Sequence, residues 1–234
     1  MPDSSFAGEP VPSLAEPRRQ PTWKSRLRDF AARALPRQVF VRQGLGGARR
    51  VALTFDDGPH ELTDAYLDVL DRFGARATFF VVGEECVRRP EALLRIVARG
   101  HEVAGHGFTH TAFPKLTAGE LRDELERTTQ LLPPTPSRWR LVRPPFGATS
   151  MRTLAVTAQV GYTTVLWSRD SDDCRTTSVE EMAARLAPDA LTPGEIILLH
   201  ECQKWTLATL PAALQAIAAA GWQMVTVGDI LQAP

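Results

Sequence analysis

The sequence predicts an α/β fold in which parallel strands are joined by helices. From residue 50 onward, short apolar runs rich in β-forming residues alternate with segments of helical periodicity. Such alternation is typical of parallel strands with crossover helices. The seven strand runs suit an open sheet or an incomplete barrel, and the length of 234 residues suits one domain of ordinary enzyme size.

The strand runs and the helical segments follow each other with little interruption. The predicted strands are Val51–Phe55, Ala77–Val82, Glu102–Ala104, Leu141–Arg143, Thr163–Trp167, Glu195–Leu199 and Gln223–Val227. Between them, apolar residues recur at helical spacing. The predicted helices are 62–73, 93–98, 121–132, 178–191 and 207–220.

The first residues differ in composition from this region. Residues 1–22 are rich in Pro, Ser, Glu and Ala without periodicity, which predicts a disordered arm. Residues 23–48 are predicted to hold a linker and one short basic amphipathic helix, at 23–36. We interpret this helix as packed on the domain rather than as a membrane or partner contact. The folded domain is predicted to span residues 49–234.

Composition excludes several classes of protein. Lys and Arg together number 27, as do Asp and Glu, whereas proteins that neutralise nucleic-acid phosphates carry a basic excess. The N-terminal residues do not resemble a signal peptide, and no run reaches the ~18 apolar residues of a membrane span. We therefore expect a cytoplasmic location without nucleic-acid or membrane contact. Three cysteines without a CxxC spacing favour free thiols over a disulfide framework.

Carboxylates and histidines follow two of the predicted strands. Asp56 and Asp57 end the first strand, and two like charges this close repel each other unless a cation or a proton relieves them. A metal ion held by one carboxylate leaves the other free as a base. His106 and His110 follow the third strand at a spacing that lets both imidazoles reach one ion. With Asp57 they offer three ligands, which leaves a position open, as in catalytic sites.

Three further clusters also follow strands. Prolines stiffen the turn after Arg143, so that the N–H of Phe146 suits an oxyanion donor and Arg143 suits a carboxylate partner. The acidic stretch Asp170–Cys174 offers a carboxylate that tunes an acid, and His200, at the end of the sixth strand, suits a general acid. Each cluster also has a plain structural interpretation, as a stiff loop, an acidic surface loop and a strand-end histidine.

Together these five clusters resemble the motifs of the polysaccharide deacetylase family, the NodB-like carbohydrate esterases. The motifs occur in the family's order, at Thr54–Pro59, His106–His110, Arg143–Gly147, Asp170–Cys174 and Leu198–Glu201. TFDDGP and the HxxxH spacing are the most specific of them. The resemblance covers about residues 50–232 of the predicted domain. It implies a distorted, incomplete (β/α) barrel with fewer than eight strands, which agrees with about seven parallel strands here.

The resemblance also implies a metal site and a base. Asp57, His106 and His110 would bind one divalent metal ion. Zinc is the ion that we expect, with Co²⁺ or Fe²⁺ as alternatives. Asp56 would be the general base, and Arg143 would orient it.

The remaining implied roles concern the acid and the substrate. His200 would protonate the leaving amine, and Asp173 would tune it. The N–H of Phe146 would stabilise the oxyanion, and Leu198 would line the pocket for the acetyl methyl group. The implied activity is metal-dependent removal of an N-acetyl group from an N-acetylhexosamine-containing oligosaccharide, glycolipid or glycoside.

Three residues differ from the usual family pattern. Gly107 stands where Ser or Thr is usual, Cys174 where Trp commonly walls the sugar groove, and Glu201 where Asp is usual. Two alternatives therefore stay open beside the deacetylase. One is an amidase acting on a non-sugar N-acyl compound, and the other is an inactive binding module that keeps the fold.

Overall fold

The computed structural model describes residues 35–134, 137–176 and 178–232. The predicted arm at 1–22 and nearly all of the predicted helix at 23–36 lie outside the described residues. Within these described residues, nine strands form one sheet in the order β1-β6-β5-β4-β3-β2-β8-β7, with β9 paired to β2. The strands are β1 Phe40–Val41, β2 Arg50–Gly58, β3 Ala77–Val81, β4 Glu102–Gly105, β5 Leu141–Val142, β6 Thr163–Val165, β7 Arg169–Asp170, β8 Ile196–His200 and β9 Gln223–Val225.

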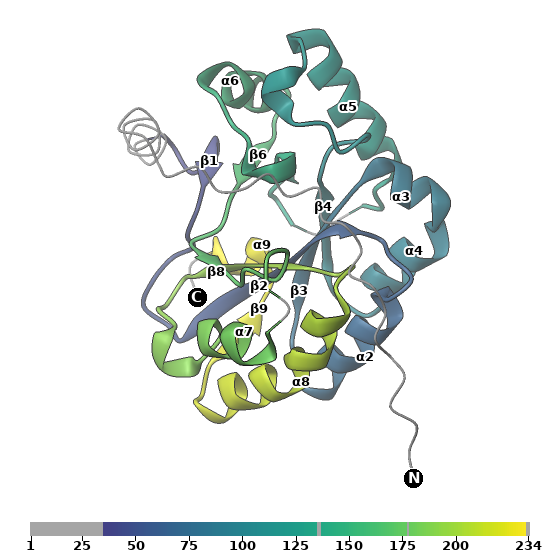
Figure 1. Cartoon of the computed structure of the whole chain (residues 1–234). Coiled ribbons are helices and arrows are strands. Elements are labelled where there is room, and N and C mark those ends of the chain that lie inside the picture. Colours follow the sequence, from purple (N-terminus) through teal and green to yellow (C-terminus); the bar gives the residue numbers. More distant parts are fainter. Residues whose placement is uncertain (1–34, 135–136, 177, 233–234) are drawn as a thin grey trace.

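All the strand ladders are parallel, and the barrel that they form is incomplete (Figure 1). The two ends of the strand order, β1 and β7, form no ladder with each other in the described part of the chain. The predicted fold class is thereby confirmed. The strands β1 and β7, of two residues each, add to the seven predicted runs.

Helices connect most of the strands and cover the outside of the barrel (Figure 1). They are α2 Thr63–Arg72, α3 Gly83–Arg88, α4 Pro90–Ala98, α5 Ala118–Leu131, α6 Met151–Gln159, α7 Val179–Arg185, α8 Lys204–Ala219 and α9 Val227–Ile230. Short 3-10 turns are η1 Phe113–Lys115, η2 Pro145–Gly147 and η3 Pro188–Ala190. Within the described residues, no helix combines the length and the apolar character needed to cross a membrane.

Several predicted elements end earlier than their sequence patterns indicated, and two of them have a clear local cause. The predicted helix 178–191 ends at Arg185, and Pro188 then opens a separate 3-10 turn. The predicted strand 223–227 ends at Val225, because the Thr226 hydroxyl accepts a hydrogen bond from the backbone N–H of Asp229 and so begins α9.

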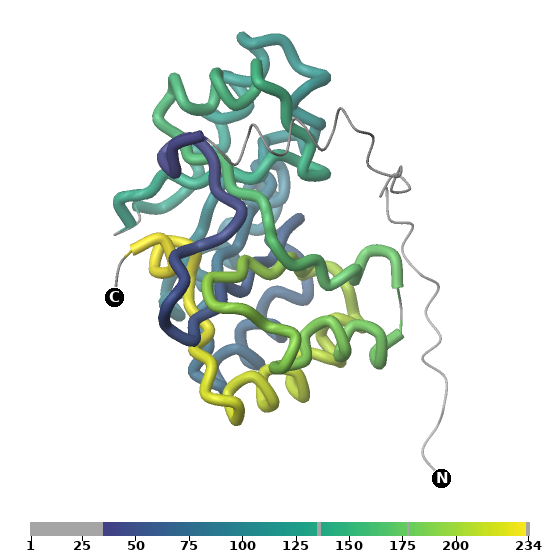
Figure 2. Tube along the Cα trace, turned by 90° about the vertical axis from the view of Figure 1, so that its left-hand side faces the viewer, coloured from purple at the N-terminus to yellow at the C-terminus, as the bar shows by residue number. Residues whose placement is uncertain are grey.

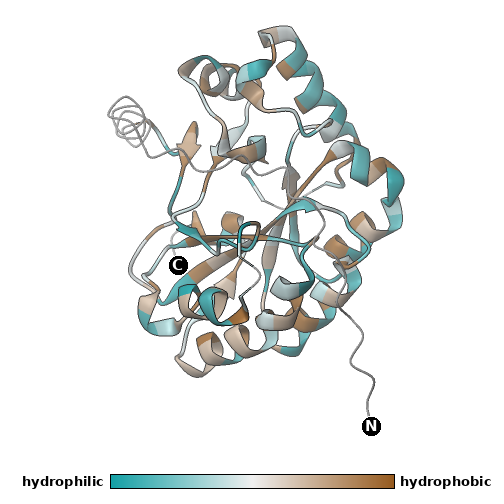
Figure 3. Cartoon of the chain, viewed as in Figure 1, coloured by the Kyte–Doolittle hydropathy of each residue, from teal (hydrophilic) through white to brown (hydrophobic). Residues whose placement is uncertain are grey.

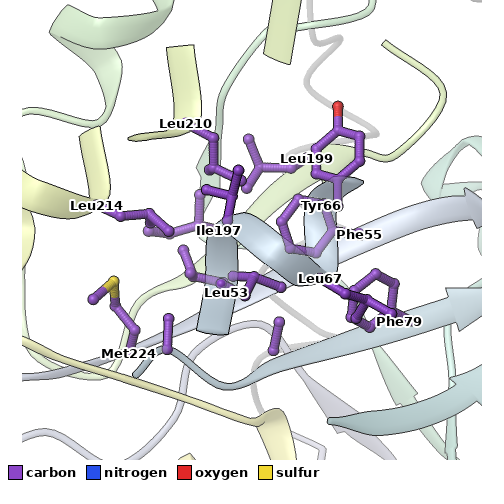
Figure 4. Packing of buried hydrophobic residues seen from close by; sticks show 14 of the residues in the cluster. Leu53, Phe55, Tyr66, Leu67, Phe79, Ile197, Leu199, Leu210, Leu214 and Met224 are labelled. Atoms are coloured by element: carbon purple, nitrogen blue, oxygen red, sulfur yellow. The ribbon is translucent and has the colours of Figure 1, made fainter. Parts of the chain in front are cut away.

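The main core lies between the sheet and the helices (Figure 4). Because strand side chains alternate between two faces, Val51, Leu53 and Phe55 of β2 pack in this core. Figure 4 shows Leu53 and Phe55 beside Tyr66 and Leu67 of α2 and beside residues of β8 and α8. Each such buried side chain contributes about 1.5–3 kcal/mol. In Figure 3 the central strands are largely brown, whereas α5, on the outside, is largely teal.

The open side of the barrel is lined by the segment that follows β1 (Figure 2). The backbone N–H of Gly44 donates to the Gly194 carbonyl at 2.7 Å, and that of Leu45 donates to the Ile230 carbonyl at 3.0 Å. A Cβ on Gly44 would lie 2.7 Å from Ile230, so this close approach requires glycine. Part of the predicted linker 23–48 therefore contacts the barrel.

Candidate active site

A bulge at the end of β2 brings two adjacent carboxylates to one site. The alternation of side chains would place Asp56 inside the barrel and point Asp57 away from it. Against β3, however, Asp56 pairs with Phe80 and Gly58 with Val81, so Asp57 is the extra residue. Its φ of 72° departs from strand geometry. Such a bulge re-aims a side chain, and both carboxylates here lie within 3.8 Å of His106 Nε2.

Asp57, His106 and His110 have the geometry of a three-ligand metal site. Asp57 Oδ1 lies 3.4 Å from His106 Nε2 and 3.1 Å from His110 Nε2. Ligands about 2.0–2.1 Å from a tetrahedral ion lie roughly 3.3 Å from each other. Burial opposes the charge of Asp57, but the side chains of His106 and His110 beside it hold its pKa well below the usual range. The three residues therefore fit one divalent ion.

The backbone fixes which nitrogen of His106 faces this site. His106 Nδ1 lies 2.7 Å from the carbonyl oxygen of Arg143. A carbonyl only accepts hydrogen bonds, so Nδ1 carries the proton and Nε2 keeps its lone pair for an ion. The turn after β5 thus orients a predicted ligand as well as carrying Arg143.

Glu124 of α5 holds the loop that carries the two histidines. Its carboxylate accepts hydrogen bonds from the backbone N–H groups of Phe108 and Thr109, at 2.6 and 2.9 Å, and from the Thr109 hydroxyl at 2.8 Å. Gly107 has a φ of 78°, and a Cβ there would lie 3.3 Å from Glu124 Oε2. Glu124 of α5 therefore fixes this loop, in which Gly107 lacks the hydroxyl group that the family usually has at that position.

Replacing Glu124 with Gln is expected to weaken metal binding by about 10- to 100-fold, as is typical when an outer partner of a metal site is lost. The amide cannot accept all three hydrogen bonds, so the loop with His106 and His110 loses its fixed position. Titration against a competing chelator measures the affinity. Glu126→Gln, an exposed residue on the same helix, is the control. Equal affinities in the two variants would contradict the role of Glu124.

Asp56 is held by a buried arginine from β5. Arg143 is fully buried, and its Nη1 donates to Asp56 Oδ1 at 2.7 Å and to the Thr54 hydroxyl at 2.8 Å. Thr54 in turn donates to the Ile197 carbonyl at 2.6 Å. The guanidinium also lies over the Phe80 ring, 4.0 Å from its centroid. These contacts fix Oδ1 of Asp56. The other oxygen, Oδ2, lies 3.8 Å from His106 Nε2.

His200 is oriented by Asp173, which follows β7. The imidazole Nδ1 lies 2.7 Å from Asp173 Oδ1, and the backbone N–H of His200 donates to Asp173 Oδ2 at 2.7 Å. The Thr206 hydroxyl donates to the same oxygen at 2.9 Å. Burial opposes the charge on His200, but the carboxylate of Asp173 outweighs this and raises the pKa of His200 well above its usual range. The raised pKa favours the protonated form of His200, which is the form that a general acid needs.

Replacing Asp173 with Asn is expected to move the alkaline limb of the kcat/KM profile to lower pH. The charge that raises the pKa of His200 is lost while the opposing burial remains. An acid works only while it is protonated, so activity then falls at a lower pH as the pH rises. The pH profile of acetate release measures the limb, with the exposed Asp189→Asn as control. A limb that stays in place would exclude Asp173 as the group that tunes His200.

The register of the sheet sets the predicted base opposite the predicted acid. Asp56 on β2 pairs directly with His200 on β8, and neighbouring strands lie about 4.8 Å apart. Leu198 lies two residues before His200, so it faces the same side of the sheet, and it is buried. The strand ends thus bring residues from distant parts of the sequence to one edge of the barrel.

Phe146 lies in η2, beside the metal cluster. Its ring centroid is 4.7 Å from that of His110, and its side chain is 51% exposed. Its φ of 60° is unusual for an aromatic residue. Asp57 and His110 also have positive φ, and such strained backbone clusters at functional sites. Three predicted site residues are therefore among the four non-glycine residues with positive φ in the described part of the chain.

Some residues of the site were not predicted from the sequence. Thr54 and Thr206 are hydrogen-bonded to Arg143 and Asp173, and Glu124 holds the loop between the two histidines. Only Thr54 had a signal in the sequence, since it shares a strand face with Asp56. Glu201 is fully buried, and burial raises its pKa to about 8. A Cβ on Gly58 would lie 1.1 Å from Glu201 Oε1, so the Gly-Pro of the first motif makes room for this side chain.

Comparison with known proteins identifies the family of the chain. Residues 44–165 match the family model described as polysaccharide deacetylase. A chitooligosaccharide deacetylase of Bradyrhizobium is 38% identical over 173 residues, which cover 69% of this chain and 76% of that protein. The chain belongs to the polysaccharide deacetylase family. The family predicted from the sequence is thereby confirmed.

The chain is also similar to other deacetylases and carbohydrate esterases. A peptidoglycan-N-acetylglucosamine deacetylase of Listeria monocytogenes is 30% identical over 94% of this chain, but the chain spans only 47% of that protein's length. The family 4 carbohydrate esterase from Streptomyces lividans, solved with acetate, is 34% identical over 74% of this chain and 90% of its own, with a TM-score of 0.69. A pseudoenzyme from Bacillus anthracis, 22% identical, has a TM-score of 0.76 over 82% of this chain and 69% of its own, and shows the fold alone.

Proposed function

We propose that the chain is a metal-dependent N-deacetylase that releases acetate from an N-acetylhexosamine-containing oligosaccharide, glycolipid or glycoside. One observation carries the proposal: Asp56 and His200 occupy paired positions on β2 and β8, beside the Asp57–His106–His110 cluster. A base and an acid next to a metal site are the groups that hydrolysis of an amide requires. Both are fixed by buried partners, as a preorganised site needs.

Asp57, His106 and His110 would hold the ion. When bound, a divalent ion lowers the pKa of water and polarises a carbonyl. The donor set of two imidazoles and one carboxylate favours zinc, and Co²⁺ or Fe²⁺ suit it as well.

Asp56 and His200 then carry out the two proton transfers. Asp56, held by Arg143, accepts a proton from the attacking water. The N–H of Phe146 donates to the oxygen that becomes negative as the carbon turns tetrahedral. His200, held by Asp173, donates its proton to the nitrogen as the C–N bond breaks. Acetate and a free amine leave.

The substrate class rests on the relatives. Their names describe deacetylation of peptidoglycan N-acetylglucosamine and of chitooligosaccharides. Cys174, in place of the usual tryptophan, removes a stacking surface of the groove, which favours a short oligosaccharide, glycolipid or glycoside over a long polymer. The cytoplasmic location and the domain boundary at residue 49 stay predictions.

Acetate release from a panel of substrates tests the proposal. The panel contains chitooligosaccharides and N-acetylglucosamine glycosides beside N-acetylated alkylamines, and cyclic imides are followed by their ring opening, which frees no acetate. Each is assayed with protein stripped by a chelator and then reloaded with Zn²⁺, Co²⁺ or Fe²⁺. We expect acetate from the sugars, only after reloading. Release that survives stripping would contradict metal dependence, and release from the non-sugar amides alone would favour the amidase. A metal-loaded protein that releases nothing would favour the binding module.

A further inference from the structure

A second group of metal-ligand atoms lies beside the acid. In the described part of the chain, Asp173, Cys174 and His200 each offer a ligand atom within 4.8 Å of the others. This group shares no residue with the Asp57–His106–His110 cluster. It combines sulfur, nitrogen and oxygen, whereas the first cluster has no sulfur.

The donor types of this second group select a thiophilic ion. Thiolate and imidazole bind Zn²⁺ and Cd²⁺ well, whereas Mg²⁺ and Ca²⁺ prefer sets of oxygen ligands. The sulfur is present because Cys174 stands where the family usually has Trp. The side chain of Cys174 is half-buried, so an ion has access to it from solvent.

The surrounding contacts hold the group in place. Trp205 Nε1 donates to the backbone carbonyl of Asp173 at 2.6 Å, which fixes the chain next to Cys174. Gln203 Nε2 points at Cys174 Sγ from 3.9 Å. Asp173 already orients His200 through Nδ1, as the outer partners of metal-bound histidines commonly do. The residues at the start of α8 therefore hold the site in place before an ion binds. When an ion binds, only the Cys174 thiol and the His200 imidazolium must release protons.

We propose that Cys174 and His200, with Asp173, bind a second divalent ion, Zn²⁺, and that this ion inhibits the enzyme. On binding, the thiol of Cys174 and the imidazolium of His200 each release a proton to solvent, and the sulfur and a ring nitrogen take the ion. His200 then has no proton to give to the leaving amine. The inhibitory effect rests on the proposed function, whereas the ion binding itself does not.

Titration of the metal-loaded protein with Co²⁺ and Cd²⁺ tests the binding. A thiolate bound to either ion gives a charge-transfer absorption band that the Asp57–His106–His110 cluster cannot give, since it has no sulfur. We expect this band on addition of a second equivalent, and we expect it in the His106→Ala/His110→Ala variant as well. Cys174→Ser is expected to lose the band, whereas Cys202→Ser, at a neighbouring half-buried cysteine, is expected to keep it.

Acetate release measures the consequence. A second equivalent of Zn²⁺ is expected to lower the rate of the unsubstituted protein by about 10²-fold, the lower end of what general acids contribute. In Cys174→Ser the ratio of rates with and without that equivalent is expected to stay near one. A protein that saturates at one ion without a thiolate band would overturn the proposal, as would a band that is lost in Cys202→Ser alone. A band that depends on Cys174 in a protein without acetate release would refute the proposed function and leave this site standing.

Discussion

Replacing Asp56 with Asn is expected to lower kcat for acetate release by about 10²- to 10⁴-fold, the usual contribution of a general base. The amide keeps the shape of the side chain, and its oxygen still accepts from Arg143 Nη1, which lies 2.7 Å from Asp56 Oδ1. It cannot take a proton from water. The loss should therefore appear in kcat, with KM changed little, because the lost interaction belongs to the transition state.

Two measurements separate this effect from a damaged site. Metal content is expected to match that of the unsubstituted protein, since Asp57, His106 and His110 are unchanged. The control is Asp68→Asn, which removes an exposed carboxylate that pairs with Arg99 on the surface. A variant of Asp56 that retains full metal and full kcat would show that another group acts as the base.

The sequence predicted the fold class because the apolar runs of the longer strands, such as β2, β3 and β8, alternate with helical segments. The strands β1 and β7 have two residues each, too few for an alternation to be visible, whereas β5, equally short, was predicted from the apolar residues before the Arg143 motif. Helix α6 was missed because hydroxyl groups lie on its buried face: Thr157 is buried and its hydroxyl lies 2.9 Å from that of Thr164. Helix α3 has only six residues, shorter than a helical period can establish.

The candidate site was predictable as a set of residues but not as a geometry. Each predicted cluster follows a strand, and parallel strands bring such ends to one edge. The bulge that turns Asp57 toward the histidines depends on the pairing of β2 with β3, and no local pattern encodes it. The contact of Glu124 with the loop at Phe108 likewise joins residues 16 positions apart through tertiary packing. Specific motifs therefore identify the chemistry, and the packing decides how each group is held.

Replacing Arg143 with Met is expected to lower the free energy of unfolding of the metal-free protein by about 3–5 kcal/mol, because the change leaves Asp56 as a buried charge without its partner. Both side chains are almost completely buried, and Arg143 Nη1 donates to Asp56 Oδ1 at 2.7 Å. Arg99→Met breaks an ion pair of similar length, 2.6 Å to Asp68, but there the side chains are 31% and 65% exposed. The surface pair contributes only about 0–1 kcal/mol, so burial accounts for the contrast.

A double variant decides whether the unpaired charge causes the loss. In Arg143→Met/Asp56→Asn the buried carboxylate is gone together with its partner, so the double variant should be more stable than Arg143→Met alone. Urea unfolding of the two single variants, the double variant and Arg99→Met measures all four free energies. If the effects of the two buried substitutions simply add, the cost comes from lost packing of the Arg143 side chain against Phe80 instead. The electrostatic explanation requires that removing the second charge restores part of the stability lost with the first.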